Sequence, residues 1–121
     1  MRSILVVDDF APFRHVVREM LDRDDGFRIV GEASDGAGAV DAVSALRPDV
    51  VLLDVHLPGD DGFMVCERLQ ALSPAPQVVL TSSHGVASFR RRLRTSAARG
   101  FISKADLTSS ALVALLDKPL T

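Results

Sequence analysis

The sequence predicts an α/β fold: a doubly wound (βα)5 domain with one five-stranded parallel sheet between layers of helices. Five short runs of apolar residues, each bounded by turn residues, are typical of strands buried on both faces. Segments with apolar residues at helical spacing follow these runs in alternation. A chain of 121 residues holds one hydrophobic core and is too short for two domains, so residues 1–121 are expected to form a single domain.

The first strand is predicted over residues 4–7, and the acidic pair Asp8-Asp9 follows it directly. A helix is expected from Ala11, because Pro12 suits a first helical turn. Its buried face repeats at the i, i+3, i+4 spacing and consists of Phe13, Val16, Val17, Met20 and Leu21. The run Asp24-Asp25-Gly26 is expected to end the helix.

The second strand is predicted over residues 27–33, and the second helix over 37–46, where Pro48 stops it. The third strand covers 50–53 and consists of four consecutive apolar residues. Asp54 stands directly at its carboxyl end, and a Pro-Gly turn soon follows. The sequence therefore puts a single carboxylate at the end of a buried strand.

The second half repeats this alternation. A helix is expected around residues 63–72, then a strand over 77–80 that runs into Thr81-Ser82-Ser83. One helix is predicted over 86–98, although its apolar face is thin. A short fifth strand over 100–103 precedes Lys104, and a helix over 107–116 follows.

Polar side chains that are able to bind ligands or to react lie where these strands end. In a parallel α/β sheet, ligands bind at the carboxyl ends of the strands, which here carry Asp8, Asp9, Asp54, Thr81 and Lys104. Carboxylates placed together repel one another unless a cation lies between them, and oxygen-only ligands favour Mg²⁺. A carboxylate can also act as a nucleophile toward phosphorus. We therefore expect Asp54 to accept a phosphoryl group.

Six motifs occur in order along the chain: Val6-Val7-Asp8-Asp9, Val30-Gly31-Glu32-Ala33-Ser34-Asp35-Gly36, Arg47-Pro48-Asp49-Val50-Val51-Leu52-Leu53-Asp54, Leu57-Pro58-Gly59-Asp60-Asp61-Gly62, Val79-Leu80-Thr81-Ser82 and Gly100-Phe101-Ile102-Ser103-Lys104. Taken together, they make the whole chain similar to receiver domains of bacterial two-component response regulators, of which CheY is an example. Each motif is weak alone, but the full set in this order is specific.

The resemblance implies the strand order 2-1-3-4-5 of a flavodoxin-like or CheY-like sheet. It makes Asp54 the phosphoacceptor and gives the metal site to Asp8, Asp9, Asp54 and the backbone carbonyl of His56. It also implies that Thr81 is the switch hydroxyl, that Lys104 binds the phosphoryl group, and that Phe101 is the switch aromatic.

Three departures from the family pattern bear on switching. Ala105 follows the lysine, where many receivers have proline; this resembles the NarL-like branch. Phe101 stands where tyrosine is more common, so no hydroxyl is present there. The stretch between Thr81 and Lys104 is slightly longer than the family pattern, which bears on the fourth helix and its partner surface.

Simpler explanations exist for each site residue. Asp54 is alternatively a strand-end cap, and Asp8 or Asp9 alternatively caps the first helix. Lys104 is alternatively an ordinary surface lysine. Thr81 alternatively just ends a strand.

Several other residues attract attention without a clear chemical pattern. Ser82 is expected to line the pocket and Ser83 to cap a helix, while His56 lies at the mouth of the site, where it would affect water access. The histidines His15 and His84 are expected to be solvated, and Cys66 to lie in the core. Residues 36–38 are expected to form a turn rather than a dinucleotide loop. The arginines expected to form a solvated helix face, or alternatively a patch for an acidic partner, are Arg90, Arg91, Arg92, Arg94 and Arg99.

Composition narrows the class of protein. A formal charge of −2 gives no reason to expect nonspecific nucleic-acid binding, so no direct nucleic-acid contact is expected. No apolar run is long enough for a membrane span, and the first residues do not form a signal peptide. The single cysteine allows no internal disulfide, which suits a cytoplasmic protein.

The expected function is a signalling switch rather than an enzyme. A histidine kinase or histidine phosphotransfer protein would phosphorylate Asp54 with Mg²⁺ bound, and the face formed by the fourth helix, fifth strand and fifth helix would contact a downstream protein. The chain would be a monomer or a phosphorylation-dependent dimer. The alternatives are a phosphorylation-independent adaptor, the receiver portion of a longer DNA-binding regulator, and a haloacid-dehalogenase-type phosphatase, which needs an Asp-x-Asp pair on its first strand.

Overall fold

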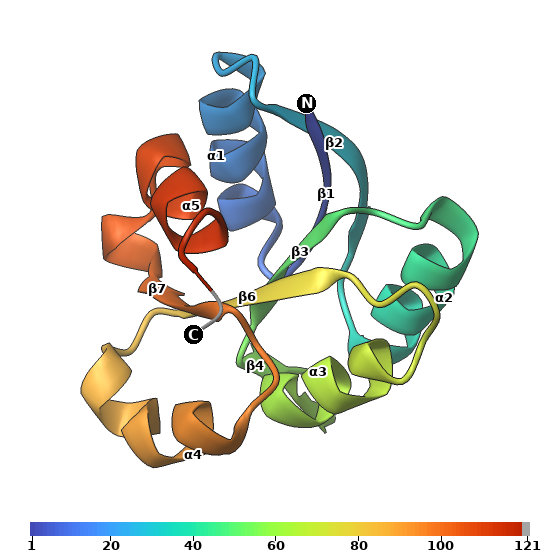
Figure 1. Ribbon diagram of the computed structural model, residues 1–121, viewed down its shortest axis with the longest axis vertical. Helices are drawn as coiled ribbons and strands as arrows, with labels where there is room; N and C mark the ends of the chain where they lie inside the picture. The colour runs from blue at the N-terminus through green and yellow to red at the C-terminus, as the bar shows by residue number, and fades with distance from the viewer. Residues whose placement is uncertain (120–121) are drawn as a thin grey trace.

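A five-stranded parallel sheet forms the centre of the protein in a computed structural model, which describes residues 1–119 (Figure 1). The strand order is β2-β1-β3-β6-β7, which is the predicted order 2-1-3-4-5. The strands are β1 (Arg2–Val7), β2 (Phe27–Ala33), β3 (Val50–Asp54), β6 (Gln77–Ser82) and β7 (Gly100–Ser103). The predicted α/β fold is confirmed.

Helices cover both faces of this sheet (Figure 1). Those of eight or more residues are α1 (Ala11–Asp22), α2 (Gly36–Leu46), α3 (Gly62–Gln70) and α5 (Ser109–Leu116). One core cluster joins the sheet to α1 and α5, and the other joins it to α2 and α3, together with Phe89 and Leu93 from the segment around α4 (Arg90–Thr95). The sheet is therefore buried on both faces.

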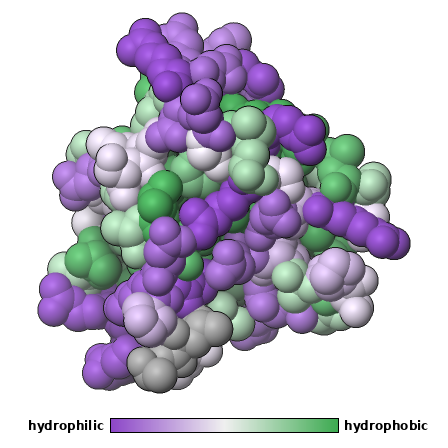
Figure 2. Space-filling model, turned by 45° about the horizontal axis from the view of Figure 1, so that its top comes forward, coloured by the Kyte–Doolittle hydropathy of each residue, from purple (hydrophilic) through white to green (hydrophobic). Residues whose placement is uncertain are grey.

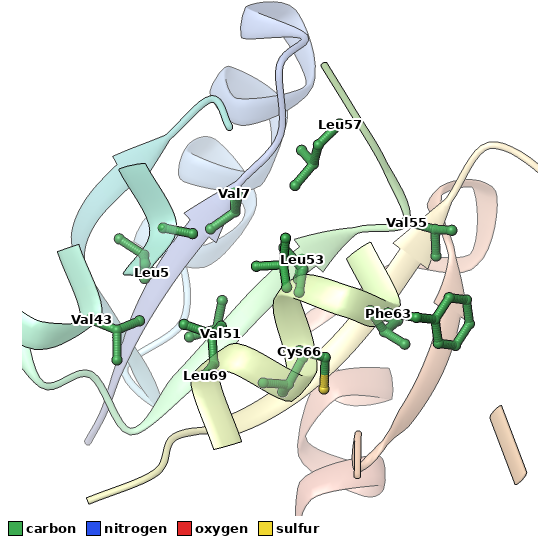
Figure 3. Packing of buried hydrophobic residues seen from close by; sticks show 14 of the residues in the cluster. Leu5, Val7, Val43, Val51, Leu53, Val55, Leu57, Phe63, Cys66 and Leu69 are labelled. Carbon is green, nitrogen blue, oxygen red and sulfur yellow. The ribbon is translucent and has the colours of Figure 1, made fainter. Parts of the chain in front are cut away.

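The central strand β3 shows how the sequence divides between the two faces. All its residues are buried, and alternate side chains of a strand point to opposite faces. Val51 and Leu53 belong to the cluster of α2 and α3, shown in Figure 3, whereas Val50 and Leu52 belong to the cluster of α1 and α5. This burial holds the strand that ends in Asp54 rigidly in the middle of the sheet.

Side-chain caps set where several helices begin. The Asp35 carboxylate accepts a hydrogen bond from the N–H of Gly38 at 2.7 Å, and Asp61 accepts one from Phe63 at 2.8 Å. Thr108 accepts one from Ala111, so α5 begins at Ser109 rather than at the expected residue 107. No side chain caps α1, so neither Asp8 nor Asp9 has the alternative capping role.

The helix predicted over residues 86–98 is shorter and irregular. A 3-10 turn, η1 (Val86–Phe89), precedes α4, and the regular helix ends at Thr95. Of this segment, Phe89 is buried in the hydrophobic core, and Leu93 and Ala98 pack against it, which is too narrow a face to stabilise a longer helix. Beyond α4, the Ser96 hydroxyl accepts the N–H of Ala98 and turns the chain toward β7.

A small hairpin that the sequence analysis did not predict follows β3. Strands β4 (His56–Leu57) and β5 (Asp60–Asp61) pair antiparallel, and Gly59 between them has φ +64°, a backbone conformation that favours glycine. The N–H of Gly62 then donates to the carbonyl of Val55 at 2.7 Å. This hairpin fixes the chain directly after Asp54.

Among residues 1–119, no helix combines the length and the apolar character needed to cross a bilayer. Figure 2 shows hydrophilic and hydrophobic residues interspersed on the face that it presents.

Candidate acidic site at the carboxyl edge of the sheet

Three carboxylates meet where β1 and β3 end. Asp8 is fully buried, Asp54 is 5% exposed, and Asp9 is exposed. One carboxylate oxygen from each lies within 4.8 Å of the others. The structure therefore brings together the three acids that the sequence analysis singled out.

Both carboxylate oxygens of Asp54 have a hydrogen-bond donor. Oδ1 accepts the backbone N–H of His56 at 3.1 Å, and Oδ2 accepts Lys104 Nζ at 3.3 Å. Burial raises the pKa of Asp54 above its usual range, the His56 N–H opposes that rise, and the negative charge of Asp8 adds to it. The ionised form of Asp54 is thus costly until a cation compensates it.

Lys104, directly after β7, is the cation that faces these acids. Its Nζ lies 2.7 Å from Asp8 Oδ2 and 3.3 Å from Asp54 Oδ2, so it is not an ordinary surface lysine. It also stands 4.4 Å from the centre of the Phe13 ring. Burial lowers the pKa of Lys104, but the two carboxylates raise it by more, so the net shift is upward and the side chain is charged.

Thr81 and Phe101 lie on the neighbouring strands. Thr81 is paired with Asp54 in the β3–β6 ladder and is fully buried. Within residues 1–119, its hydroxyl oxygen has no hydrogen-bond partner. Phe101, on β7, is partly buried, and its ring lies 5.6 Å from that of Phe89. The hydroxyl is thus placed beside the acid site with its hydrogen-bonding capacity free.

A cavity of 760 Å³ opens over the acids. Asp9, Asp54, Ser83 and Lys104 form its polar wall. The other wall is built by the side chains of Phe10, Pro12, Phe13, Val16, His56, Leu57 and Pro58, and of these the sequence analysis expected His56 alone at the site. Phe10 and Val16 are 59% and 60% exposed, and the apolar Phe10 directly after the acidic pair was the available signal for this wall.

Ser82 and Ser83 do not have the positions that the sequence predicted for them. Ser82 is fully buried, and its hydroxyl accepts the N–H of His84 at 3.1 Å, so it closes a turn. Ser83, expected as a helix cap, lines the cavity instead. The turn that Ser82 closes carries Ser83 to the cavity.

Two of the three histidines lie together. His56 and His84 are exposed, and their rings meet edge to face with centroids 5.5 Å apart. His56 also lies 5.8 Å from Phe89, and it lines the mouth of the cavity as expected. His15 is exposed on α1, as expected.

The remaining residues of interest are structural or lie on the surface. Cys66 is fully buried in the core, as expected. The expected glycine turn over residues 36–38 is instead the first turn of α2. Arg99 does not belong to the exposed arginine face of α4, because its guanidinium donates to the carbonyls of Leu115 and Leu116 and so satisfies the end of α5.

The donor set suits a hard divalent cation. Three carboxylates face one lysine, so negative charge in the group is not fully balanced by the side chains present. All three donors are oxygen atoms, which Mg²⁺ prefers, and Asp9 is exposed enough to leave room for bound water. The residues therefore fit the ion that the sequence analysis expected.

Comparisons with known proteins agree with this geometry. The family profile described as the response regulator receiver domain matches residues 4–117. A Pseudomonas aeruginosa protein named as a transcriptional regulator is 38% identical over 114 residues, which cover 94% of this chain and 55% of that protein. A protein-glutamate methylesterase/protein-glutamine glutaminase from Xanthomonas campestris is 33% identical and matches 96% of this chain and 38% of its own length. The chain thus spans about half or less of these two relatives.

Solved structures share the whole fold. The signal receiver domain of the response regulator NarL from Mycobacterium tuberculosis is 30% identical, with a TM-score of 0.84, and the match covers 97% of this chain and 98% of that one. A LuxR-family response regulator from Aurantimonas is 24% identical with a TM-score of 0.85 over 98% of this chain and 87% of that one, which supports the fold alone. The profile match over residues 4–117 and these similarities show that the chain belongs to the response regulator receiver domain family.

Proposed function

We propose that Asp54 accepts a phosphoryl group from the phosphohistidine of a histidine kinase or a histidine phosphotransfer protein. The observation that carries the proposal is the convergence of Asp54 with Asp8, Asp9 and Lys104 at the opening of a cavity. Among these acids Asp54 alone ends the central strand β3, with one oxygen held by a backbone N–H. The cavity gives a donor imidazole a path to it.

The transfer exchanges one bond to phosphorus for another. A carboxylate oxygen of Asp54 forms the new P–O bond while the P–N bond of the donor breaks, and the electron pair returns to the imidazole nitrogen, which takes up a proton. Asp8, Asp9, Asp54 and the His56 carbonyl are the proposed ligands for Mg²⁺, which when bound offsets the charge of the carboxylates and the phosphoryl oxygens. Lys104 pairs with another phosphoryl oxygen.

Thr81 and Phe101 are the proposed switch. The Thr81 hydroxyl is buried beside Asp54 without a competing partner, so it is free to donate to a phosphoryl oxygen. Movement of Thr81 toward the phosphoryl group leaves space for the Phe101 ring. That change biases the surface formed by α4, β7 and α5, which contacts the downstream protein.

The wider biological setting belongs to the same proposal. Residues 1–121 act as one receiver domain, a signalling switch without substrate turnover of its own, in the cytoplasm. It is a monomer or a dimer formed on phosphorylation, and its output is a protein contact rather than direct contact with nucleic acid. The single buried Cys66 suits a reducing compartment.

Incubation with Mg²⁺ and acetyl phosphate, followed by intact-protein mass measurement, tests the proposal. We expect one phosphoryl adduct in the wild type and none in Asp54→Asn or in a sample treated with EDTA. An adduct that persists in Asp54→Asn would place the chemistry elsewhere. If no adduct forms with acetyl phosphate or with a panel of phosphorylated histidine kinases, the proposal fails and a phosphorylation-independent adaptor becomes the better description.

A further inference from the structure

Lys104 needs contacts that aim its amino group, because four flexible carbon–carbon bonds separate the ammonium from the backbone. It opens the short turn η2 (Lys104–Asp106), and the residue after it is Ala105, which does not restrict the backbone as proline would. The position of Nζ therefore depends on what surrounds the side chain.

Two kinds of contact surround Nζ. The carboxylates of Asp8 and Asp54 lie 2.7 and 3.3 Å away, and the ring of Phe13 lies with its centre 4.4 Å away. The distance to the ring is well within the roughly 6 Å over which an ammonium is attracted to an aromatic face. The side chain of Lys104 is only 19% exposed, so water weakens this attraction little.

The Phe13 ring is itself held in place. Phe13 lies in the first turn of α1 directly after Pro12, and its N–H donates to the carbonyl of Phe10 at 3.1 Å. Its side chain is partly buried and packs against the core cluster that joins α1 and α5 to the sheet. The ring thus has a fixed base in the core and also lines the cavity over Asp54.

We infer that Phe13 is a positioning residue that holds the Lys104 ammonium beside Asp54 for phosphoryl transfer. The inference rests on the proposed function for the role of Lys104, but the contact itself does not. A divalent ion at the site competes with Lys104 for Asp8 and Asp54, and a phosphoryl group competes with these carboxylates for Lys104. The Phe13 ring carries no charge and meets no such competition, so it keeps the ammonium at the site when the ion pairs change.

Lysine NMR tests the contact without reference to activity. The chain has two lysines, Lys104 and the exposed Lys118, so ¹³C-lysine labelling gives two sets of side-chain signals with a built-in reference. An aromatic ring shifts protons above its face upfield, so we expect the Lys104 ε-protons upfield of those of Lys118, both with EDTA and with Mg²⁺. Phe13→Leu should abolish this difference and Phe13→Tyr should keep it.

The rate of phosphorylation by acetyl phosphate at saturating Mg²⁺ tests the role. We expect Phe13→Leu to lower the rate about tenfold, a value between those for an exposed and a fully desolvated cation–π contact, and Phe13→Tyr to restore most of it. Phe27→Leu is the matched control, because Phe27 belongs to the same core cluster but does not line the cavity. It should leave both the rate and the Lys104 signals unchanged.

The outcomes separate this inference from the proposed function. A wild-type rate in Phe13→Leu, an equal loss in Phe27→Leu, or Lys104 signals that coincide with those of Lys118 would overturn the positioning role. Absence of any phosphoryl adduct in the wild type, with the ring shift present, would instead overturn the proposed function and leave the contact established.

Discussion

At the scale of single residues, the buried position of Asp54 lowers the stability of the folded protein. Its carboxylate is buried next to Asp8, and one lysine serves both acids. The folded protein therefore holds charge that an unfolded chain would hydrate more favourably. This is the usual consequence of collecting like charges at one site.

Replacement of Asp54 by asparagine should therefore stabilise the metal-free protein. The pKa of Asp54 is raised in the folded state, so its ionisation destabilises the fold at neutral pH, and this penalty disappears as pH falls below the unfolded pKa near 3.8. We expect Asp54→Asn to raise the free energy of unfolding by roughly 1 kcal/mol at pH 7 in EDTA, measured by urea denaturation. Asp41→Asn, on the exposed side of α2, is the control and should change little. A decrease in stability would contradict the argument.

Cys66 carries a thiol, a reactive group, that is buried and therefore inaccessible to reagents in solution. Burial raises the pKa of its thiol, which lies in the core with the Ser96 hydroxyl 4.0 Å from the sulfur. We expect native protein at pH 7.5 to react with a thiol reagent such as DTNB only as fast as it unfolds, and one thiol per chain to react at once in guanidinium chloride. Rapid reaction of the native protein would show that the α3–β6 side of the core opens.

At the scale of elements, the segment after β3 depends on a glycine. A Cβ at Gly62 would lie 2.4 Å from the carbonyl oxygen of Asp54 and 2.7 Å from Val55 Cα, and both are backbone atoms that a rotamer change cannot move. The first turn of α3 thus packs directly against the end of β3. Close packing of the hairpin segment and α3 sets the position of Asp54.

Gly62→Ala should therefore cost about 2–3 kcal/mol of stability and slow phosphorylation of Asp54 as well. Gly85→Ala is its matched control, because nothing lies within 4 Å of the added carbon and φ is −75°. That control should be neutral or slightly stabilising. Thermal melts together with the acetyl phosphate assay measure both effects, and equal melting temperatures for the two variants would refute the steric explanation.

Elements also show where sequence patterns fail. The apolar run of β3 predicts its burial well, because a strand buried on both faces can be recognised without knowing which elements pack against it. In the segment 86–98, Phe89, Leu93 and Ala98 contact the core, so its helix is set by contacts with other elements and not by its own pattern. The β4–β5 hairpin was missed because two-residue strands leave no periodicity in a sequence.

At the scale of the whole molecule, topology converts sequence order into a site. Asp8, Asp54, Thr81 and Lys104 are far apart in the chain, but each stands at the carboxyl end of a parallel strand, so the fold alone predicts that they meet. The cavity wall from α1 and the contact of Phe13 with Lys104 could not be predicted in this way. They depend on how one helix packs across the sheet, which local patterns do not specify.

Because the acids join the ends of β1 and β3 to Lys104 beyond β7, a cation bound there should stabilise the whole domain. Binding to the folded state alone raises the free energy of unfolding by about 2.7 kcal/mol at a concentration one hundred times the Kd. We expect the melting temperature to rise with the logarithm of Mg²⁺ concentration at constant ionic strength. Asp8→Asn should remove the rise, whereas Asp41→Asn should keep it. A rise that survives Asp8→Asn would mean that Mg²⁺ acts elsewhere, and the stabilisation would then carry no information about the acidic site.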